Sequence, residues 1–267
     1  MPQAESFTAP FVVVGVDGSR AALRAAVWAI EEARSRDVPL RLVWVAVDDL
    51  PDPLPAAVEA VLGTGSDVRL QTETLTGEPA AALLAASGGA VMICVGAAGL
   101  KDSGARRVGS TAAALIATAH CPVAVVRGST GTGGWVVADL DETPDSAAVL
   151  QTAVAQARLR AAPLRVLGAW QSRYTDVHDP AAVSDGNRLV RTQLDRRLSQ
   201  WRSRYPDLDA EPVAVHGGVL DYLSAHSASI QLVVVGARNA DAVAELFGPA
   251  LHDTGCSILV VDRQRLL

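Results

Sequence analysis

Three glycines and a serine in the N-terminal half follow a spacing that suits phosphate binding. Gly96 ends an apolar run, and Gly99, Gly109 and Ser110 follow it in the pattern G-x2-G-x9-G-S. A strand that feeds a glycine-punctuated loop and then a helix presents free backbone N–H groups at the start of that helix. These amides and the helix dipole together attract anions, phosphates above all. The spacing therefore predicts a nucleotide pocket between residues 96 and 111.

Alternating strands and helices must position this loop. Apolar or alternating runs of strand length, several of them rich in valine, occur at 11–16, 40–47, 68–76, 91–96 and 123–126. Helical stretches separate them, the first of which can be capped by Ser19 and places Leu23, Val27 and Ile30 on one face. Strands that alternate with helices in this way predict an α/β fold with a parallel sheet and helices on both faces.

The same pattern then occurs a second time. GSTGTGG at 128–134 is a flexible linker by composition, and WVVADL at 135–140 matches FVVVGV at 11–16. Asp141 falls where Asp17 stands in the first copy. Repetition on this scale indicates two tandem doubly wound domains, each a five-stranded, mainly parallel sheet with helices on both faces. The predicted organisation is a flexible tail at 1–9, a first domain at 10–127, the linker, and a second domain at 135–267.

The composition disfavours several classes of protein. Hydrophobic residues make up 49% of the 267 and charged residues 19%, which suits a well-buried core and argues against global disorder. A net charge of −6 disfavours broad binding to nucleic acid or to anionic membranes. Cys94, Cys121 and Cys256 are scattered, which indicates small core residues in a reducing compartment. We see no signal peptide and no membrane-spanning run, and we expect a cytoplasmic protein.

These motifs together resemble those of a tandem universal stress protein. The resemblance rests on V-D-G-S at 16–19, on the glycine spacing from Gly96 to Ser110, and on C-P-V-A-V-V at 121–126. GEPAAALL at 77–84 and GGVLDYL at 217–223 fit the entrance of the family's fourth helix. The resemblance covers essentially the whole chain. It implies that the first domain binds ATP, together with Mg²⁺.

The resemblance also implies which residues hold the nucleotide. They should converge in a crevice beyond the carboxyl ends of the strands, where the strand order reverses. Asp17 and the main chain of Val45 would hold the nucleoside, and glycines would let the backbone approach the ribose and phosphates. Helix-start amides and hydroxyls, with loop cations, would meet the phosphates. The expected contacts are Gly15, Asp17, Val45, Gly96, Gly99, Lys101, Arg107, Gly109, Ser110 and Thr111.

Simpler interpretations of the same residues stay open. Gly96 and Gly99 could be turn residues, and Asp17 could serve only a turn or a cap. Ser110 is expected to cap its helix, which is compatible with phosphate binding. Arg106 and Arg107 could be a solvated pair. The histidines show no metal-ligand spacing, and the sequence contains neither G-x-S-x-G nor a G-x4-G-K-[ST] loop. We therefore expect no catalytic or metal-binding residues, and at most slow ATP hydrolysis.

The second copy departs from the glycine pattern. Asn239 replaces the second glycine, and Asp139 and Glu142 replace Gly15 and Gly18. The helix start falls near Glu245, and the only other candidate glycine, Gly248, precedes a proline that lacks the N–H a phosphate needs. Added carboxylates also repel a triphosphate. We expect this copy to be free of nucleotide and to have a structural or partner-facing role.

The sequence therefore predicts an ATP-binding regulatory protein of the stress response. The nucleotide would act as a state marker for association or for contact with an unidentified regulatory protein. By the resemblance, the last strands at 123–126 and 258–261 pair, giving a pseudo-dimer within the chain or a homodimer. One alternative is a nucleotide-free interaction protein with a vestigial glycine loop. Another is a nucleotidyl transferase, against which stands the lack of any HxGH-like pair.

Overall fold

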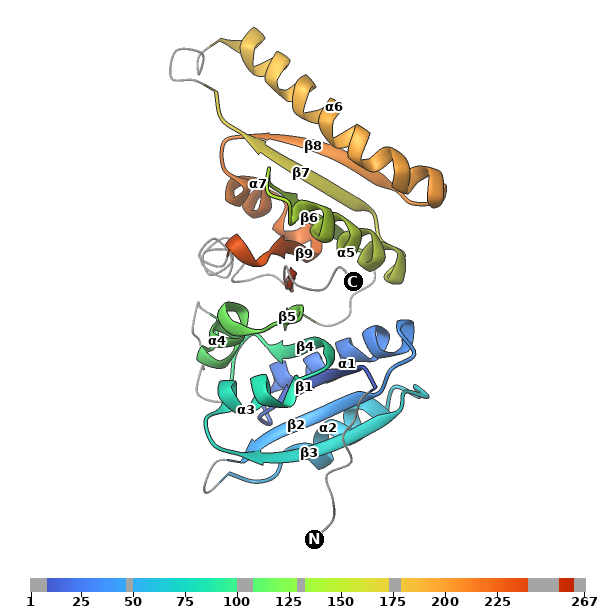
Figure 1. The fold of residues 1–267 in the computed structure, drawn as a ribbon, viewed down its shortest axis with the longest axis vertical. Helices are drawn as coiled ribbons and strands as arrows, with labels where there is room; N and C mark the ends of the chain where they lie inside the picture. Colours follow the sequence, from blue (N-terminus) through green and yellow to red (C-terminus); the bar gives the residue numbers. More distant parts are fainter. Residues whose placement is uncertain are drawn as a thin grey trace. The chain divides into compact units, whose positions relative to one another are not determined.

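A computed structural model describes residues 9–46, 50–99, 108–128, 133–172, 179–239 and 255–261. The chain divides into two compact units, residues 1–130 and 131–267. Each unit holds a five-stranded parallel sheet with helices on both faces (Figure 1). The predicted fold class is therefore confirmed. None of the helices in the described residues is both long enough and apolar enough to span a bilayer.

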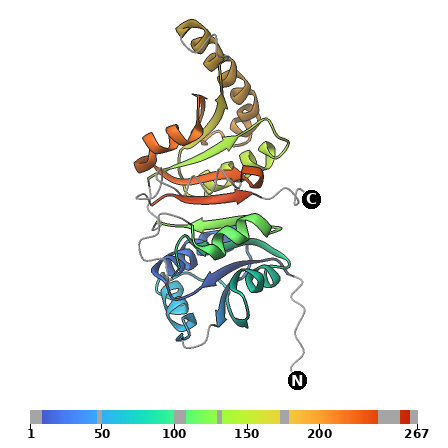
Figure 2. The ribbon, with the colours of Figure 1, turned by 90° about the vertical axis from the view of Figure 1, so that its left-hand side faces the viewer.

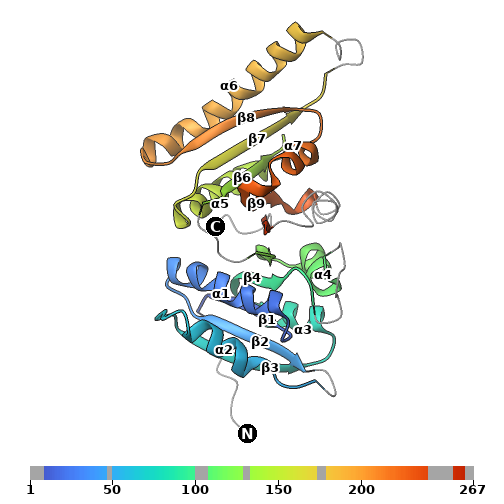
Figure 3. The same ribbon diagram turned by 180° about the vertical axis from the view of Figure 1, so that it is seen from behind.

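The sheet of the N-terminal unit has the strand order β3-β2-β1-β4-β5. Its strands are β1 (Phe11–Val16), β2 (Leu40–Ala46), β3 (Leu70–Thr76), β4 (Ala90–Gly96) and β5 (Val123–Val126). The helices α1 (Arg20–Ser35) and α2 (Leu54–Leu62) lie on one face (Figure 3), and α3 (Pro79–Ala86) and α4 (Ser110–Thr118) lie on the other. The chain runs outward from β1 to β3 and then returns to β4 on the other side of β1. This reversal is the position at which open parallel sheets bind ligands.

Local sequence explains the central elements of this unit. The valine-rich β1 is buried along nearly its whole length because helices cover both faces of the sheet. Helix α1 begins after Ser19, whose hydroxyl oxygen accepts a hydrogen bond from the Ala22 backbone N–H at 3.1 Å. Its alanine-rich inner face is buried, so α1 can pack close to the strands. Helix α2 begins at Leu54, whose backbone N–H donates to an Asp52 carboxylate oxygen at 2.8 Å.

The C-terminal unit repeats this topology. The strand order is β10-β9-β6-β7-β8, and the 3₁₀ turns Ser227–Ser229 and Ala237–Asn239 flank β9. The strands are β6 (Trp135–Leu140), β7 (Leu164–Trp170), β8 (Ala210–His216), β9 (Ile230–Gly236) and β10 (Ser257–Val261). The helices are α5 (Ser146–Leu159), α6 (Pro180–Arg204) and α7 (Val219–Ala225). In the side view, α7 lies on one side of the sheet, and α5 and α6 lie on the other (Figure 2).

Helix α6 is much longer than its counterpart α2. It begins at Pro180, because the Asp179 carboxylate accepts the Ala181 backbone N–H at 2.9 Å and proline suits a first helical position. The Trp170 ring at the end of β7 packs directly on Gly186, where an added Cβ would approach the ring to 2.2 Å. The Trp170 indole N–H also donates to the Asn187 side-chain oxygen at 2.8 Å. These contacts fix the first half of α6 on the sheet.

Candidate functional site

A cavity of about 310 Å³ opens in the N-terminal unit beyond the carboxyl ends of β1, β2 and β4. The start of α4 and the first residues of α3 complete its walls. It is lined by eight predicted contacts, namely Gly15, Asp17, Val45, Gly96, Gly99, Gly109, Ser110 and Thr111. The predicted cations Lys101, Arg106 and Arg107 lie outside the described residues. The described part of the prediction thus falls in one crevice.

A hydrogen-bonded turn after β1 forms one side of the cavity. An Asp17 carboxylate oxygen accepts the Ser19 backbone N–H at 2.9 Å, and Gly18 between them has a φ of +85° that favours glycine. The Ser19 hydroxyl donates to the Ala98 carbonyl oxygen at 3.3 Å, which joins this turn to the glycine loop. Asp17 therefore has the turn role that a simpler interpretation gives it, and its carboxylate also lines the cavity.

Close packing explains the first two glycines of the motif, Gly96 and Gly99. An added Cβ at Gly96 would come within 2.7 Å of the Ala21 carbonyl carbon and of the Ala22 backbone nitrogen. Any side chain there would push the start of α1 away from β4. An added Cβ at Gly99 would lie 3.0 Å from an Asp17 carboxylate oxygen. Gly96 therefore allows α1 to pack close to β4, a role that is separate from both the expected ligand contact and the turn interpretation.

The start of α4 faces the same cavity without a side-chain cap. The cap position is Gly109, which has extended dihedrals and offers no side chain to the first-turn amides. Its own N–H donates to the Ala97 carbonyl oxygen at 3.0 Å, which closes the loop onto the end of β4. Ser110, expected as the cap, is the first helical residue, so that expectation is wrong. The cap residue thus leaves the first-turn N–H groups of α4, beside Ser110 and Thr111, without a side-chain acceptor from Gly109.

The walls of the cavity differ in polarity. Apolar side chains near β1, β2 and α3 form one part, and the described residues with polar side chains lie beside the turn and α4. The apolar part includes Trp44, Leu50, Pro79, Leu83 and Val95. Sequence reasoning did not assign Pro79 and Leu83 to the site, although the GEPAAALL segment places α3 at the same edge. The described residues contain no cluster of three or more metal-ligating side chains. The arrangement suits a ligand with an apolar planar part and an anionic part.

The corresponding turn of the C-terminal unit keeps the aspartate hydrogen bond of the first, but α5 begins five residues after Asp141, whereas α1 begins three residues after Asp17. An Asp141 carboxylate oxygen accepts the Thr143 backbone N–H at 3.0 Å and the Ser146 hydroxyl at 2.8 Å. The loop after β9 is tied differently, because the Arg238 guanidinium pairs with the Asp145 carboxylate at 3.2 Å. The predicted helix start near Glu245, with Gly248, lies outside the described residues. The turn is therefore shared, whereas the described part of the loop is not.

Two neighbouring carboxylates at the carboxyl end of β6 have opposite pKa shifts. Burial, together with the nearby negative charge of Asp141, raises the pKa of Asp139 to about 6. Burial also acts to raise the pKa of Asp141, but hydrogen bonds from Thr143 and Ser146 outweigh it and lower that pKa. Asp139 stands in the place of Gly15, where an added Cβ in the first unit would come within 2.8 Å of a methyl group of Leu83, so the second unit holds a half-buried acid at a position that is closely packed in the first.

Comparison with known proteins places this geometry in context. The model of the Universal stress protein family matches residues 11–64 and 56–127, both within the N-terminal unit. One universal stress protein of Mycobacterium tuberculosis strain H37Rv is 37% identical, over 98% of this chain and 99% of the relative. Another from the same strain is 36% identical over 94% of this chain and 96% of its own length. The second unit is thus matched through relatives of full length.

Solved structures show the same tandem fold at lower identity. A putative universal stress protein from Pseudomonas aeruginosa UCBPP-PA14 is 16% identical, with a TM-score of 0.66 over 95% of this chain and 93% of that one. A universal stress protein from Archaeoglobus fulgidus DSM 4304 is 11% identical, with a TM-score of 0.67 over 94% of this chain and 96% of that one. These likenesses concern the fold of both units.

Proposed function

The chain belongs to the universal stress protein family, and we propose that its N-terminal unit binds ATP as a regulatory ligand. The observation that carries this proposal is the uncapped start of α4, which faces the polar end of an otherwise largely apolar cavity. Such a helix start is a ready anion site. An apolar crevice with a few convergent polar groups is also typical of a small-molecule pocket.

The described side chains fit the parts of ATP. The adenine ring would lie against the apolar wall that includes Val45 and Leu83, and the ribose hydroxyls would reach the Asp17 carboxylate. The phosphates would accept hydrogen bonds from the first-turn amides of α4 and from the hydroxyls of Ser110 and Thr111. Lys101 and Arg107 of the loop would offset their charge. Asp17 is the one carboxylate among the described lining residues, so Mg²⁺ would be held chiefly by the phosphates and water.

We propose that the bound nucleotide marks a state and is consumed slowly at most. Fast hydrolysis needs a positioned base or a charged group that stabilises the transition state. Among the described lining residues, the groups available are one carboxylate and three hydroxyls, and Asp17 is already engaged in the turn after β1. We accordingly assign no catalytic residue.

We propose that nucleotide binding is detected through the association of the protein with other chains. Within their own units, β5 and β10 are the outermost strands of the two sheets. Edge strands present backbone groups that pair with another strand. We propose pairing through these edges, either as a pseudo-dimer in one chain or as a homodimer, with nucleotide occupancy altering contact with a regulatory partner.

A charge introduced at the start of α4 tests the pocket. The Ser110→Glu variant places a carboxylate among the amides that would meet the phosphates, while an acidic residue at a helix start supports folding. The neutral control is Ser110→Gln, which has nearly the same shape. We expect the wild type and Ser110→Gln to bind ATP in calorimetric titrations, and Ser110→Glu to bind at least about tenfold more weakly. Equal affinity of both variants would remove the assignment.

A second candidate is a nucleotide-free interaction protein with a vestigial glycine loop. The packing roles of Gly96 and Gly99 favour it, because both glycines would be retained without any ligand. The same titration separates the two candidates. Wild-type protein that neither co-purifies with nucleotide nor takes up ATP at millimolar concentration would support the second candidate.

A further inference from the structure

Helix α6 concentrates positive charge on a unit that is otherwise acidic. Residues 180–204 contain six arginines and two aspartates, a net charge of +4. The rest of residues 131–267 has seven arginines against fourteen aspartates and glutamates, a net charge of −7. A nine-residue helix, α2, holds the equivalent place in the N-terminal unit and contains one charged residue, Glu59. The basic helix is therefore a property of the second unit alone.

Only part of this charge is neutralised within the helix. Arg188 pairs with Asp185 at 2.8 Å, and Arg202 pairs with Asp195 at 2.8 Å. Arg204 lies over the Tyr205 ring, and the guanidinium groups of three further exposed arginines form no ion pair, hydrogen bond or ring contact with any described residue. These three are Arg191, Arg196 and Arg197. A free guanidinium is a planar donor suited to carboxylates and other planar anions.

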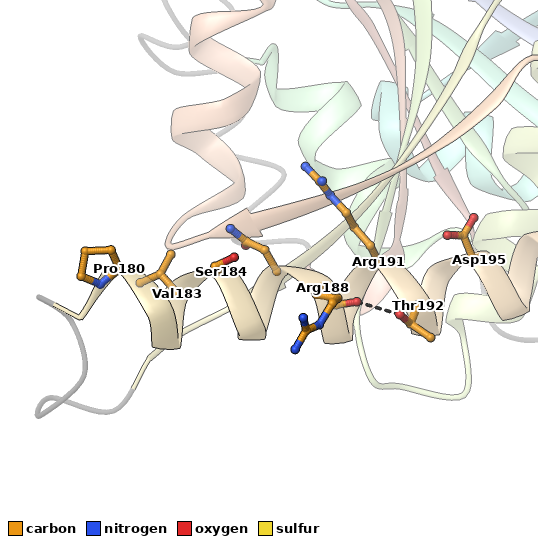
Figure 4. Close-up of a pocket in the computed structure, with 8 residues that line it drawn as sticks. Pro180, Val183, Ser184, Arg188, Arg191, Thr192 and Asp195 are labelled. Atoms are coloured by element: carbon orange, nitrogen blue, oxygen red, sulfur yellow. Dashed lines mark hydrogen bonds between the residues drawn. The ribbon is translucent and has the colours of Figure 1, made fainter.

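A shallow groove of about 710 Å³ runs along the same helix (Figure 4). It is lined by Ser184, Asn187, Arg188, Arg191, Thr192 and Asp195. Figure 4 shows the side chains of Arg188 and Arg191 extending to opposite sides of the helix, so their charges are not confined to one side of it. Leu189, on the same stretch, is 60% exposed. The exposed side of α6 as a whole, rather than the groove alone, therefore combines unpaired guanidinium groups, hydroxyls and a large apolar side chain.

We infer that α6 is a docking surface for an acidic segment of a partner protein, a segment that carries several carboxylates and at least one large apolar side chain. The carboxylates would pair with the arginines that lack an internal partner, and the apolar side chain would cover Leu189. Asp185 and Asp195 would fix the register, because a misplaced carboxylate would meet one of them. This inference does not rest on nucleotide binding by the first unit.

A nucleic acid fits this surface less well. Two aspartates interrupt the arginines, and the remainder of the unit has a charge of −7 that repels a long polyanion. Base stacking needs accessible aromatic rings. The two aromatic residues at this end of the helix, Trp201 and Tyr205, are half-buried and stack on each other at 6.3 Å between ring centroids. Leu189 offers a contact that a phosphate backbone does not use.

A synthetic helical peptide that presents glutamates around a central leucine is the probe, and the same peptide with glutamine in place of glutamate is its control. We expect the acidic peptide to bind the full chain by fluorescence anisotropy, with the control at least about tenfold weaker. Binding should weaken as salt is raised. Failure of the acidic peptide to bind, or equal binding of the control, overturns the inference. Tighter binding of a single-stranded oligonucleotide or of phosphatidylserine vesicles also overturns it.

Paired and unpaired arginines of the same helix provide matched variants. The double variant Arg191→Gln/Arg196→Gln removes two unneutralised charges, and Arg188→Gln/Arg202→Gln removes two charges already paired within the helix. We expect a loss of about tenfold in peptide affinity for the first and of about twofold for the second. Circular dichroism checks that both remain folded. Equal losses would contradict the role of the free arginines.

Discussion

The two units share one sheet topology but hold the start of their first helix at different distances from the central strands. In the N-terminal unit, the start of α1 lies so close to the end of β4 that a Cβ on Gly96 would meet its backbone at 2.7 Å. In the C-terminal unit, a Cβ on Gly236 would find its nearest neighbour, a methyl group of Val149, at 3.6 Å. A side chain at this glycine position would therefore clash with the helix in the N-terminal unit but not in the C-terminal unit. The two units therefore have the same fold although the packing beside this glycine differs.

The largest expected effect comes from breaking this asymmetry with alanine. Gly96→Ala should destabilise the N-terminal unit by about 3 kcal/mol, because backbone atoms of α1 must move. The matched change Gly236→Ala should alter the stability of the C-terminal unit by less than about 1 kcal/mol. Hydrogen exchange resolved by unit measures both. Similar values for the two variants would show that the helix starts are equally tolerant.

A second effect concerns the acid that replaces Gly15. The pKa of Asp139 is raised to about 6 in the folded chain, so the fold favours its protonated form. The resulting stabilisation is complete below the unfolded pKa near 3.8 and is lost as pH rises through about 6. Asp139→Asn removes this dependence, and at neutral pH it should stabilise the C-terminal unit by up to about 3 kcal/mol.

Urea titrations of wild type and variant across that pH range provide the measurement. The difference in unfolding free energy between them should grow as pH rises from about 4 to about 7. A difference that stays constant with pH would mean that Asp139 keeps an ordinary pKa.

A third, smaller effect tests the turn that both units share. Ser19→Ala removes the cap of α1 and the link to Ala98, and should cost about 1 kcal/mol. Thr143→Ala should cost less, about 0.5 kcal/mol, because the Thr143 hydroxyl bonds the Asp141 carboxylate and caps no helix amide. Thermal unfolding of the two variants ranks them. The reverse order would indicate that the second turn depends more on its hydroxyl than the first.

The smallest effect concerns the ion pair that ties the second loop. Arg238 is half exposed and pairs with Asp145, where the first unit has Ala98 linked through Ser19. Arg238→Ala should cost about 0.5 to 1 kcal/mol at low salt, and less at high salt because ions screen exposed pairs. Unfolding midpoints at two salt concentrations measure this. A loss that does not depend on salt would point to packing of the side chain instead.

The sheet and the position of the crevice were predictable because they depend on periodicity. Valine-rich runs such as 11–16 indicate buried parallel strands, and the carboxyl ends of such strands meet at one edge. The helix starts were less predictable. Gly109, rather than Ser110, occupies the cap position of α4, because its extended dihedrals place the first helical turn after it. The arginine-rich pattern of residues 185–204 predicts a helix, but α6 begins five residues earlier, because Asp179 caps the helix just before Pro180.

The physical reason for Gly96 could not be predicted from the sequence either. Glycine at the end of a strand suggests that another group lies close to the strand backbone, and the expected group was the ligand. The neighbour in the structure is the backbone of α1, which the chain reaches about 75 residues earlier. A contact between segments so distant in sequence depends on the packing angle of the helix on the sheet, and local patterns do not encode that angle.

The Trp170 ring on Gly186 has a consequence for how fast a partner would be captured. Because no side chain separates the ring from the helix backbone, α6 cannot roll on the sheet without a clash. The unneutralised arginines therefore keep one orientation relative to the sheet of their unit, and their combined field acts on an approaching acidic segment before contact. Steering of this kind raises the association rate more than the lifetime of the complex. Substitution of Arg191 or Arg196 should accordingly lower the association rate more than it shortens the lifetime of the complex.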